Sequence, residues 1–128
     1  MQWRNPELRL DQDSIYDLLV VRGLDDWLQP ADFFDVARYA HPSTEDEYRA
    51  AAVSLGQRLL RDGHALAGDL VEGEHQPWRG PADEQMARLS QLWSDRDVDP
   101  RFEFVWFDLT ASGAKWAEAA LARVPDVD

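Results

Sequence analysis

The chain has 128 residues, of which 45% are apolar and 30% charged, a balance that predicts one globular domain and excludes wholesale disorder. It contains no cysteine, which excludes disulfide bonds, thiolate zinc sites and cysteine nucleophiles. Its 25 acidic and 13 basic residues give a net charge of −12, which disfavours phosphates and favours cationic partners, unless it serves solubility alone.

The first half of the chain predicts three helices, over residues 14–22, 30–40 and 44–62. Ser14 followed by Asp17 resembles a capping box at the start of the first helix. The third helix has the clearest signals, because Thr44 and Glu47 form a capping box and arginines lie near its C-terminus, where the helix dipole favours cations.

The second half predicts a strand over 64–71, a loop over 72–81, a helix over 81–95, a strand over 102–109 and a closing helix over 111–124. The strand at 102–109 is apolar on both faces, so we expect both faces to be covered. Thr110 suits the N-cap of the closing helix. Gly113, in its first turn, allows a close approach to a neighbouring backbone.

The N-terminal residues contain no apolar run typical of a signal peptide, and no stretch of the chain approaches membrane-spanning length. We therefore expect a cytoplasmic protein that does not associate with membranes.

The order of these elements and two motifs carry a resemblance. The third helix ends in "RLLRDGHALAGDLV", and the later strand ends in "WFDLTASG". These segments resemble the winged helix-turn-helix domain of bacterial regulators, in which similar motifs lead into the first wing strand and out of the second. The resemblance implies one α+β domain over 1–128, mostly helical with a small antiparallel β-sheet. Its winged-helix-like core would span 14–72 and 102–123, with a helical insertion at 73–101 where the family has a short hairpin.

The resemblance also implies a regulator that binds DNA as a dimer through its third helix. The candidate DNA contacts are then Arg49, Arg58 and Arg61. Acidic residues, however, occupy the leading end of this helix and the start of the wing: Glu45, Asp46, Glu47, Glu72 and Glu74. Because carboxylates at these places would face phosphates and bases, the sequence favours the fold of this family over its DNA binding.

No motif predicts catalysis. The histidines are His41, His64 and His75, and none has the spacing of a known metal site or catalytic signature. His75 lies between acidic residues in a segment that is more typical of a solvated loop than of a metal site. We expect no enzymatic activity, no metal and no cofactor.

The six tryptophans suggest where contacts with a partner lie. Those at positions 27, 93, 106 and 116 have amphipathic or buried settings and are expected in the core. Trp78 differs, because it lies beside Arg79 in a segment stiffened by prolines, and Trp and Arg are enriched in binding hot spots. The alternative is that Trp78 folds back onto the fourth helix.

Together these patterns predict a non-enzymatic, acidic protein-binding domain whose partner is a basic protein. One version is an immunity or antitoxin-type protein that covers the active site of a cationic toxin. The candidate partner contacts are Trp78, Arg79, Glu45, Asp46, Glu47, Asp95, Asp97 and Asp99. The alternative is a winged-helix DNA-binding transcriptional regulator.

Overall fold

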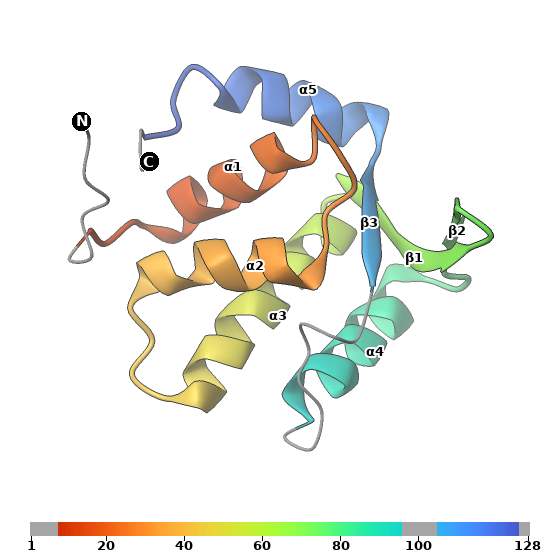
Figure 1. The fold of residues 1–128 in the computed structure, drawn as a ribbon, viewed down its shortest axis with the longest axis horizontal. Helices are drawn as coiled ribbons and strands as arrows, with labels where there is room; N and C mark the ends of the chain where they lie inside the picture. The colour runs from red at the N-terminus through yellow and green to blue at the C-terminus, as the bar shows by residue number, and fades with distance from the viewer. Residues whose placement is uncertain (1–7, 96–104, 126–128) are drawn as a thin grey trace.

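The computed structural model describes residues 8–95 and 105–125 and confirms the expected α+β class (Figure 1). The described helices are α1 (Gln12–Arg22), α2 (Pro30–Ala37), the 3-10 helix η1 (Arg38–Ala40), α3 (Glu45–Arg61), α4 (Ala82–Ser94) and α5 (Ala111–Ala120). The described strands are β1 (Ala65–Val71), β2 (Glu74–Pro77) and β3 (Trp106–Leu109), which form an antiparallel sheet in the order β2-β1-β3. None of the helices in these ranges combines the length and the apolar composition that crossing a bilayer requires.

Local capping chemistry sets where the helices begin. The hydroxyls of Thr44 and Thr110 each accept a backbone N–H three residues further on, at 3.1 Å, so both expected N-caps are confirmed. α1 begins before Ser14, because Asp11 caps it and accepts the N–H of Ser14 at 2.7 Å. The predicted capping box of Ser14 with Asp17 is therefore wrong. The hydrogen bond from Ser14 lowers the pKa of Asp11 below its ordinary value.

A tight hairpin joins β1 to β2. Glu72 and Gly73 both have positive φ (52° and 81°), as favoured in two-residue turns between antiparallel strands. Residues 68–71 of β1 pair with residues 74–77 of β2. The prediction of a loop over 72–81 is thus wrong for four of its residues. This edge strand is short and almost without apolar side chains, so no alternating pattern indicated it.

β3 has a backbone partner on each side, β1 on one side and the single residue Leu28 on the other. It pairs with residues 65–68 of β1, and on its other side Phe107 exchanges two backbone hydrogen bonds with Leu28, at 2.8 and 2.9 Å. β1 and β3 are the two segments that the winged-helix resemblance assigned to the wing strands. Their pairing agrees with that assignment, while membership of the winged-helix family stays a prediction.

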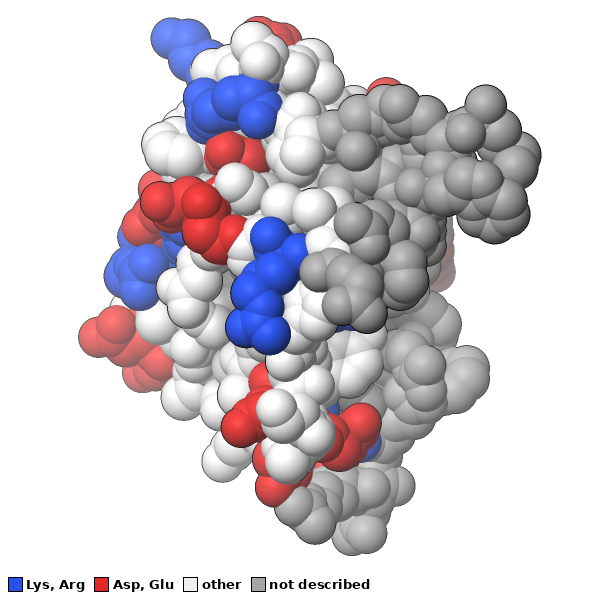
Figure 2. Space-filling model, turned by 90° about the vertical axis from the view of Figure 1, so that its left-hand side faces the viewer, with Lys and Arg blue, Asp and Glu red and all other residues white. Residues whose placement is uncertain are grey.

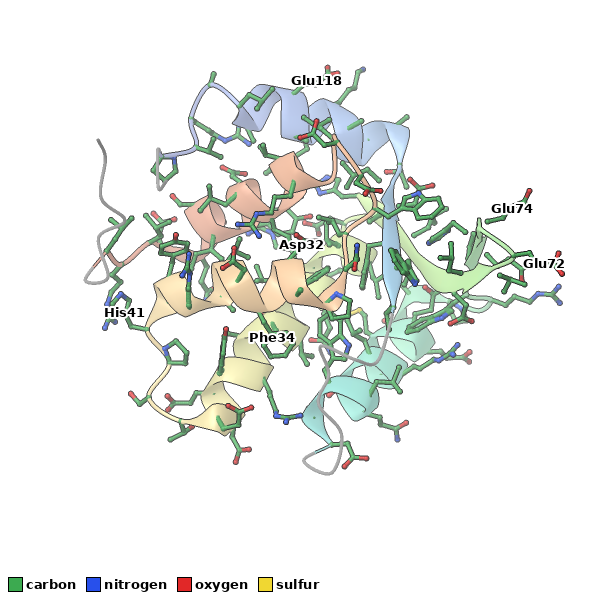
Figure 3. The ribbon with its side chains drawn as sticks, viewed as in Figure 1. Asp32, Phe34, His41, Glu72, Glu74 and Glu118 are labelled. Atoms are coloured by element: carbon green, nitrogen blue, oxygen red, sulfur yellow. The ribbon has the colours of Figure 1, made fainter. Side chains whose placement is uncertain are left out.

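The core lies between the helices and the inner face of the sheet. Phe33, Trp93 and Phe107 are fully buried, with ring centroids 5.0 Å apart for Phe33–Trp93 and 4.8 Å apart for Phe33–Phe107. Phe34 points from α2 toward α3, where its ring meets Tyr48 edge-on at 5.2 Å (Figure 3). Because Trp93 belongs to α4, the segment predicted as an insertion contributes to the same core as the rest of the chain.

The closing helix α5 is fixed against α1 and against the junction of α3 with β1. A Cβ on Gly113 would clash with the carbonyl oxygen of His64, which confirms the close backbone approach expected there. The buried carboxylate of Asp17 accepts hydrogen bonds from Trp116 Nε1 at 2.9 Å and from Arg123 Nε at 2.8 Å. These partners neutralise a charge that would be costly to bury alone.

Candidate partner-binding surface

The helix expected to enter a DNA groove, α3, is covered along one side by α4. Leu89 of α4 is fully buried and occupies the space beside Gly56, where a Cβ would clash with the leucine side chain. The side-chain amide of Gln57 donates to the carbonyl of Met86 at 3.3 Å. Figure 1 shows the two helices packed together. One face of α3 is therefore occupied by α4 and is not open to a nucleic acid.

Arg49 links the start of α3 to the end of α4. It is 8% exposed, and its guanidinium donates to the carbonyl oxygens of Trp93 (3.2 Å) and Asp95 (2.9 Å) and to the carboxylate of Glu45 (3.2 Å). The carbonyls at a helix C-terminus carry partial negative charge, which a cation stabilises. Arg49 thus joins two helices, and the structure does not present it as the exposed DNA contact that the resemblance implied.

The other two candidate DNA contacts are also paired with carboxylates. The guanidinium of Arg58 lies 4.0 Å from the centre of the Tyr16 ring and forms ion pairs with Asp13 (2.8 Å) and Asp62 (3.6 Å). Arg61 is exposed and pairs with Asp62 at 3.5 Å. Figure 2 shows positive and negative side chains interspersed on the face that lies at the left of Figure 1. Among the described residues in this view, no continuous positive stripe is present that could follow a phosphate backbone.

The acidic start of α3 is exposed, as the sequence indicated, but its carboxylates have structural partners. Glu47 accepts the backbone N–H of Ser43 at 2.7 Å, and Glu45 pairs with Arg49. Both lie at the helix N-terminus, where negative charge is favourable. Through Arg49 this segment lies near Asp95 at the end of α4. Of the other predicted contacts, Asp97 and Asp99 lie outside the described residues.

Trp78 folds back onto the protein, which is the second of the two alternatives. It is 7% exposed, its indole N–H lies 3.4 Å from a carboxylate oxygen of Asp69, and the guanidinium of Arg88 from α4 lies 4.0 Å from the ring centre. The structure therefore does not offer Trp78 as an exposed hot spot, although Arg79 beside it is exposed.

The outer face of the sheet carries a group of aromatic and aliphatic side chains that the sequence did not single out. This aromatic sheet face consists of Trp27, Leu66, Leu70, His75 and Trp106. Leu66 and Leu70 are 47% and 39% exposed, and the three ring-bearing residues are half-buried. The Trp27 ring lies 6.0 Å from that of Trp106, edge to face, and 5.8 Å from that of His75.

The described end of the 102–109 strand is covered on one face only. Phe107 is fully buried on the inner face, whereas Trp106 on the outer face is half-buried. We expected cover on both faces because the alternating residues are all large and apolar. That pattern arises equally when one face is an exposed binding surface, and composition alone does not separate the two cases.

A glycine makes room for the aromatic sheet face. His75 Nε2 lies 2.8 Å from the backbone oxygen of Trp106, so its imidazole reaches across β1 to β3. A Cβ on Gly68 would clash with the backbone oxygen of Gln76 in β2 and would lie 2.8 Å from the imidazole carbon Cε1 of His75. A glycine inside a strand often marks such a close approach, and "LAGDL" contained this signal. The hydrogen bond orients the His75 ring beside Trp27.

The segments that build the aromatic sheet face are strongly acidic. Residues 24–29, 66–77 and 106–109 contain six carboxylates and no lysine or arginine. The six are Asp25, Asp26, Asp69, Glu72, Glu74 and Asp108. Figure 3 shows Glu72 and Glu74 pointing away from the body at the tip of the β1–β2 hairpin. These 22 residues thus carry a charge of −6, half of the net charge of the whole chain.

The histidines do not form a hydrolytic arrangement within the described residues. His64 is buried and shares a hydrogen bond of 2.7 Å with the hydroxyl of Tyr16, and His41 bonds to the carbonyl of Leu8. An open cleft between α1 and α5 holds carboxylates, among them those of Asp13 and Asp17, but no histidine lines it. In the described part of the chain, no group of three acidic or histidine side chains is placed to hold a metal ion.

Comparisons of the chain with protein families, curated proteins and solved structures found no match.

Proposed function

We propose that the protein is a non-enzymatic, acidic domain that binds a basic protein partner, built on a winged-helix-like scaffold. The charge of −12 favours a cationic partner and accelerates association with it by electrostatic steering. An immunity or antitoxin-type protein, which covers the basic active site of a toxin such as a nuclease, is the version we favour. We propose that it acts in the cytoplasm.

One observation supports protein binding over DNA binding most directly. The helix that would recognise DNA, α3, is already in contact with other parts of the same protein. α4 occupies one face of α3, and Arg49, Arg58 and Arg61 each contact a carboxylate. A DNA-binding helix gains most of its affinity from cations that are free to neutralise phosphates. On α3 those cations already have negative partners, and its N-terminus is acidic.

The alternative, a DNA-binding regulator, is favoured by the arrangement of the sheet. β1 and β3, the segments assigned to the wing strands, pair antiparallel, and α3 leads directly into β1. For DNA binding, Arg58 and Arg61 would have to exchange their carboxylate partners for phosphates.

To distinguish the two functions, the domain is used to capture its partner from an extract of the native cell, and binding is then measured with the purified partner. We expect a protein of high isoelectric point, whose association rate with the domain falls about tenfold between roughly 50 and 300 mM salt. The variant Glu45→Gln/Glu47→Gln tests the acidic start of α3 with its helix geometry kept. Arg58→Glu serves as a control, because it should leave the capture intact.

DNA is the competing ligand in the same experiment. Salt-dependent binding to genomic fragments in a gel shift, lost in Arg58→Glu, would overturn the proposal in favour of the regulator. A captured partner that is itself acidic, or whose association is insensitive to salt, would also contradict it. If the immunity version holds, adding the domain suppresses the activity of the captured partner in proportion to the fraction bound.

A further inference from the structure

We propose that the aromatic sheet face binds an arginine-bearing segment of the partner protein. The inference rests on the proposed function, because it requires a basic protein partner. It adds the place where that partner docks and the side chains by which it is recognised. None of the residues predicted as contacts from the sequence belongs to this surface.

The Trp27 indole, which packs against His75 and Trp106, is suited to a guanidinium. A guanidinium is attracted to the face of an indole within about 6 Å, and tryptophan is the strongest of the aromatic residues in this interaction. Trp27 is held by a hydrogen bond from its backbone N–H to the carboxylate of Asp26 at 2.7 Å. His75 bonds to the carbonyl of Trp106 at 2.8 Å and lies against the Trp27 ring. The Trp27 ring also packs against the rings of His75 and Trp106, at 5.8 and 6.0 Å between centroids, which limits the conformational entropy that it loses on binding.

The aliphatic part of the surface matches the rest of an arginine side chain. Leu66 and Leu70 project from β1 on the same face as Trp106 and are 47% and 39% exposed. The methylene groups of a long cationic side chain pack on such apolar surface while its charged end remains near carboxylates. An apolar centre with a polar rim is also the usual anatomy of a protein-binding site.

Charge decides which occupant the surface accepts. Asp25, Asp26, Glu72 and Asp108 lie in the loops and strands of this face, and its three segments contain no lysine or arginine. A second copy of the chain would bring the same carboxylates against it, and a nucleic acid would bring phosphates; both are repelled. A cationic segment brings the opposite charge, so it is the occupant to which we commit.

The acidic start of α3 is the competing surface, and it lacks these properties. Its carboxylates serve a helix N-terminus, and Glu45 and Glu47 already have partners in Arg49 and Ser43. The exposed residues that follow along α3 are small, Ala50 and Ser54. The start of α3 attracts cations at long range, but its aromatic ring, Tyr48, is packed edge-on against Phe34 and donates its hydroxyl to the Phe34 carbonyl.

The tryptophan indole N–H signals allow a direct test by nuclear magnetic resonance. The ¹⁵N-labelled protein is titrated with a short peptide that alternates arginine with leucine, and in parallel with the same peptide carrying citrulline, the uncharged analogue of arginine. We expect the indole signals of Trp27 and Trp106 to shift with the arginine peptide and to remain in place with the citrulline peptide. The signals of Trp78, Trp93 and Trp116 should stay unchanged. Trp27→Phe and Trp106→Phe assign the two signals.

Paired variants measure how much each part of the surface contributes. Leu66→Ser/Leu70→Ser changes two exposed side chains and is expected to weaken binding of the arginine peptide at least tenfold. Asp25→Asn/Asp26→Asn removes two charges beside Trp27 while keeping an oxygen that accepts the Trp27 N–H. Its matched control is Glu45→Gln/Glu47→Gln, which removes the same charge at α3 and should change the affinity less than twofold. Thermal unfolding of each variant confirms that it remains folded.

Three outcomes of the titration would overturn the inference. These are shifts confined to the amides of Glu45 and Glu47, equal shifts with the arginine and citrulline peptides, or no shift at Trp27 and Trp106. Concentration-dependent sedimentation abolished by Leu66→Ser/Leu70→Ser would assign the surface to a second copy and also overturn it. If the captured partner binds the wild type and Leu66→Ser/Leu70→Ser equally well, this inference fails while the proposed function stands. If no basic protein binds at all, the proposed function fails.

Discussion

Gly113 lies where the chain has no room for a side chain. Its Cα faces the carbonyl oxygen of His64 at the start of β1, and an ideal Cβ would overlap that oxygen. The neighbour is backbone, held by the hydrogen bond from the N–H of Thr110 to the same oxygen at 3.0 Å, so it cannot move aside as a flexible side chain would. The position of α5 on the protein therefore depends on the absence of a side chain at residue 113.

Gly113→Ala is expected to lower the free energy of unfolding by about 3 kcal/mol, because α5 must shift away from His64. Urea denaturation followed by tryptophan fluorescence measures the change. Ser112→Ala, one residue earlier on the exposed side of the same helix, is the matched control and should remain within about 0.5 kcal/mol of the wild type. Equal stability of the two variants would contradict the close contact.

Tyr16 makes the stability of the protein sensitive to alkaline pH. Burial raises the pKa of its hydroxyl well above the ordinary value, with a further contribution from the negative charge of Asp62. Above about pH 10 the unfolded chain loses this proton while the folded protein retains it, so the free energy of unfolding falls as pH rises. The loss is at most about 1.4 kcal/mol per pH unit for this one proton.

Tyr16→Phe is expected to flatten the pH dependence of stability between about pH 10 and 12, since the variant has no proton to retain there. At neutral pH it should be less stable by about 1 kcal/mol, because the hydrogen bond with His64 is lost. Urea midpoints at a series of pH values compare the two slopes. Identical alkaline slopes in both proteins would show that the Tyr16 hydroxyl titrates as freely in the folded state as in the unfolded one.

At the scale of whole elements, α4 determines what α3 is able to do. The two helices meet through Leu89 and Gly56 and are joined at their ends by Arg49. Since α4 also contributes Trp93 to the aromatic core, it is not an appendage to an otherwise complete domain.

Leu89→Ala tests this role of α4. The substitution leaves a cavity between α3 and α4 and is expected to destabilise the protein by about 3 kcal/mol. Gln91→Ala, on the exposed side of the same helix, is the control and should have little effect. A loss below about 1 kcal/mol at Leu89 would mean that α4 contributes little to the shared core.

The elements that could be predicted from the sequence are those with local chemical signals. Thr44 and Thr110 cap their helices as expected, and the glycine in the last helix makes the expected backbone contact, because these features depend on a few neighbouring residues. β2 was missed because an exposed edge strand of four residues contains no hydrophobic alternation. Its pairing with β1 depends on the backbone conformation of Glu72 and Gly73.

The candidate surface was harder to predict than the fold. From the sequence, Trp27 is expected in the core and Trp78 is singled out as a candidate contact, whereas the structure has Trp78 buried and Trp27 half-buried on the sheet surface. Trp78 is buried with Arg88 of α4 over its ring, whereas Trp27 is half-buried and packs against His75 and Trp106. Such differences arise from tertiary packing between distant segments, which local patterns do not contain.

At the scale of the whole molecule, the net charge of −12 acts on the folded state itself. Ion pairs such as Arg22 with Asp35 and Arg58 with Asp13 offset part of the repulsion among carboxylates. With 25 acidic and 13 basic residues, however, many carboxylates have no cation to balance them. Compact folding brings these charges closer together than they are in the unfolded chain, so repulsion lowers stability.

Added salt is therefore expected to stabilise the protein. Raising sodium chloride from about 20 to 500 mM should increase the melting temperature by roughly 3 °C, because the screening length falls below the spacing of the surface carboxylates. Differential scanning calorimetry measures the change. A melting temperature that falls with salt would mean that the attractive ion pairs outweigh the repulsion.

The hydrogen bonds from Trp116 and Arg123 to Asp17 span 99 and 106 residues of sequence. During synthesis, a nascent chain that has released only its first hundred residues has made α1 but neither donor for the carboxylate in its middle. If the Asp17 carboxylate were buried before these two donors were present, its charge would lie away from water without a partner, which is costly. Packing of α1 around this carboxylate therefore becomes favourable only after Trp116 and Arg123 have been synthesised and can reach it.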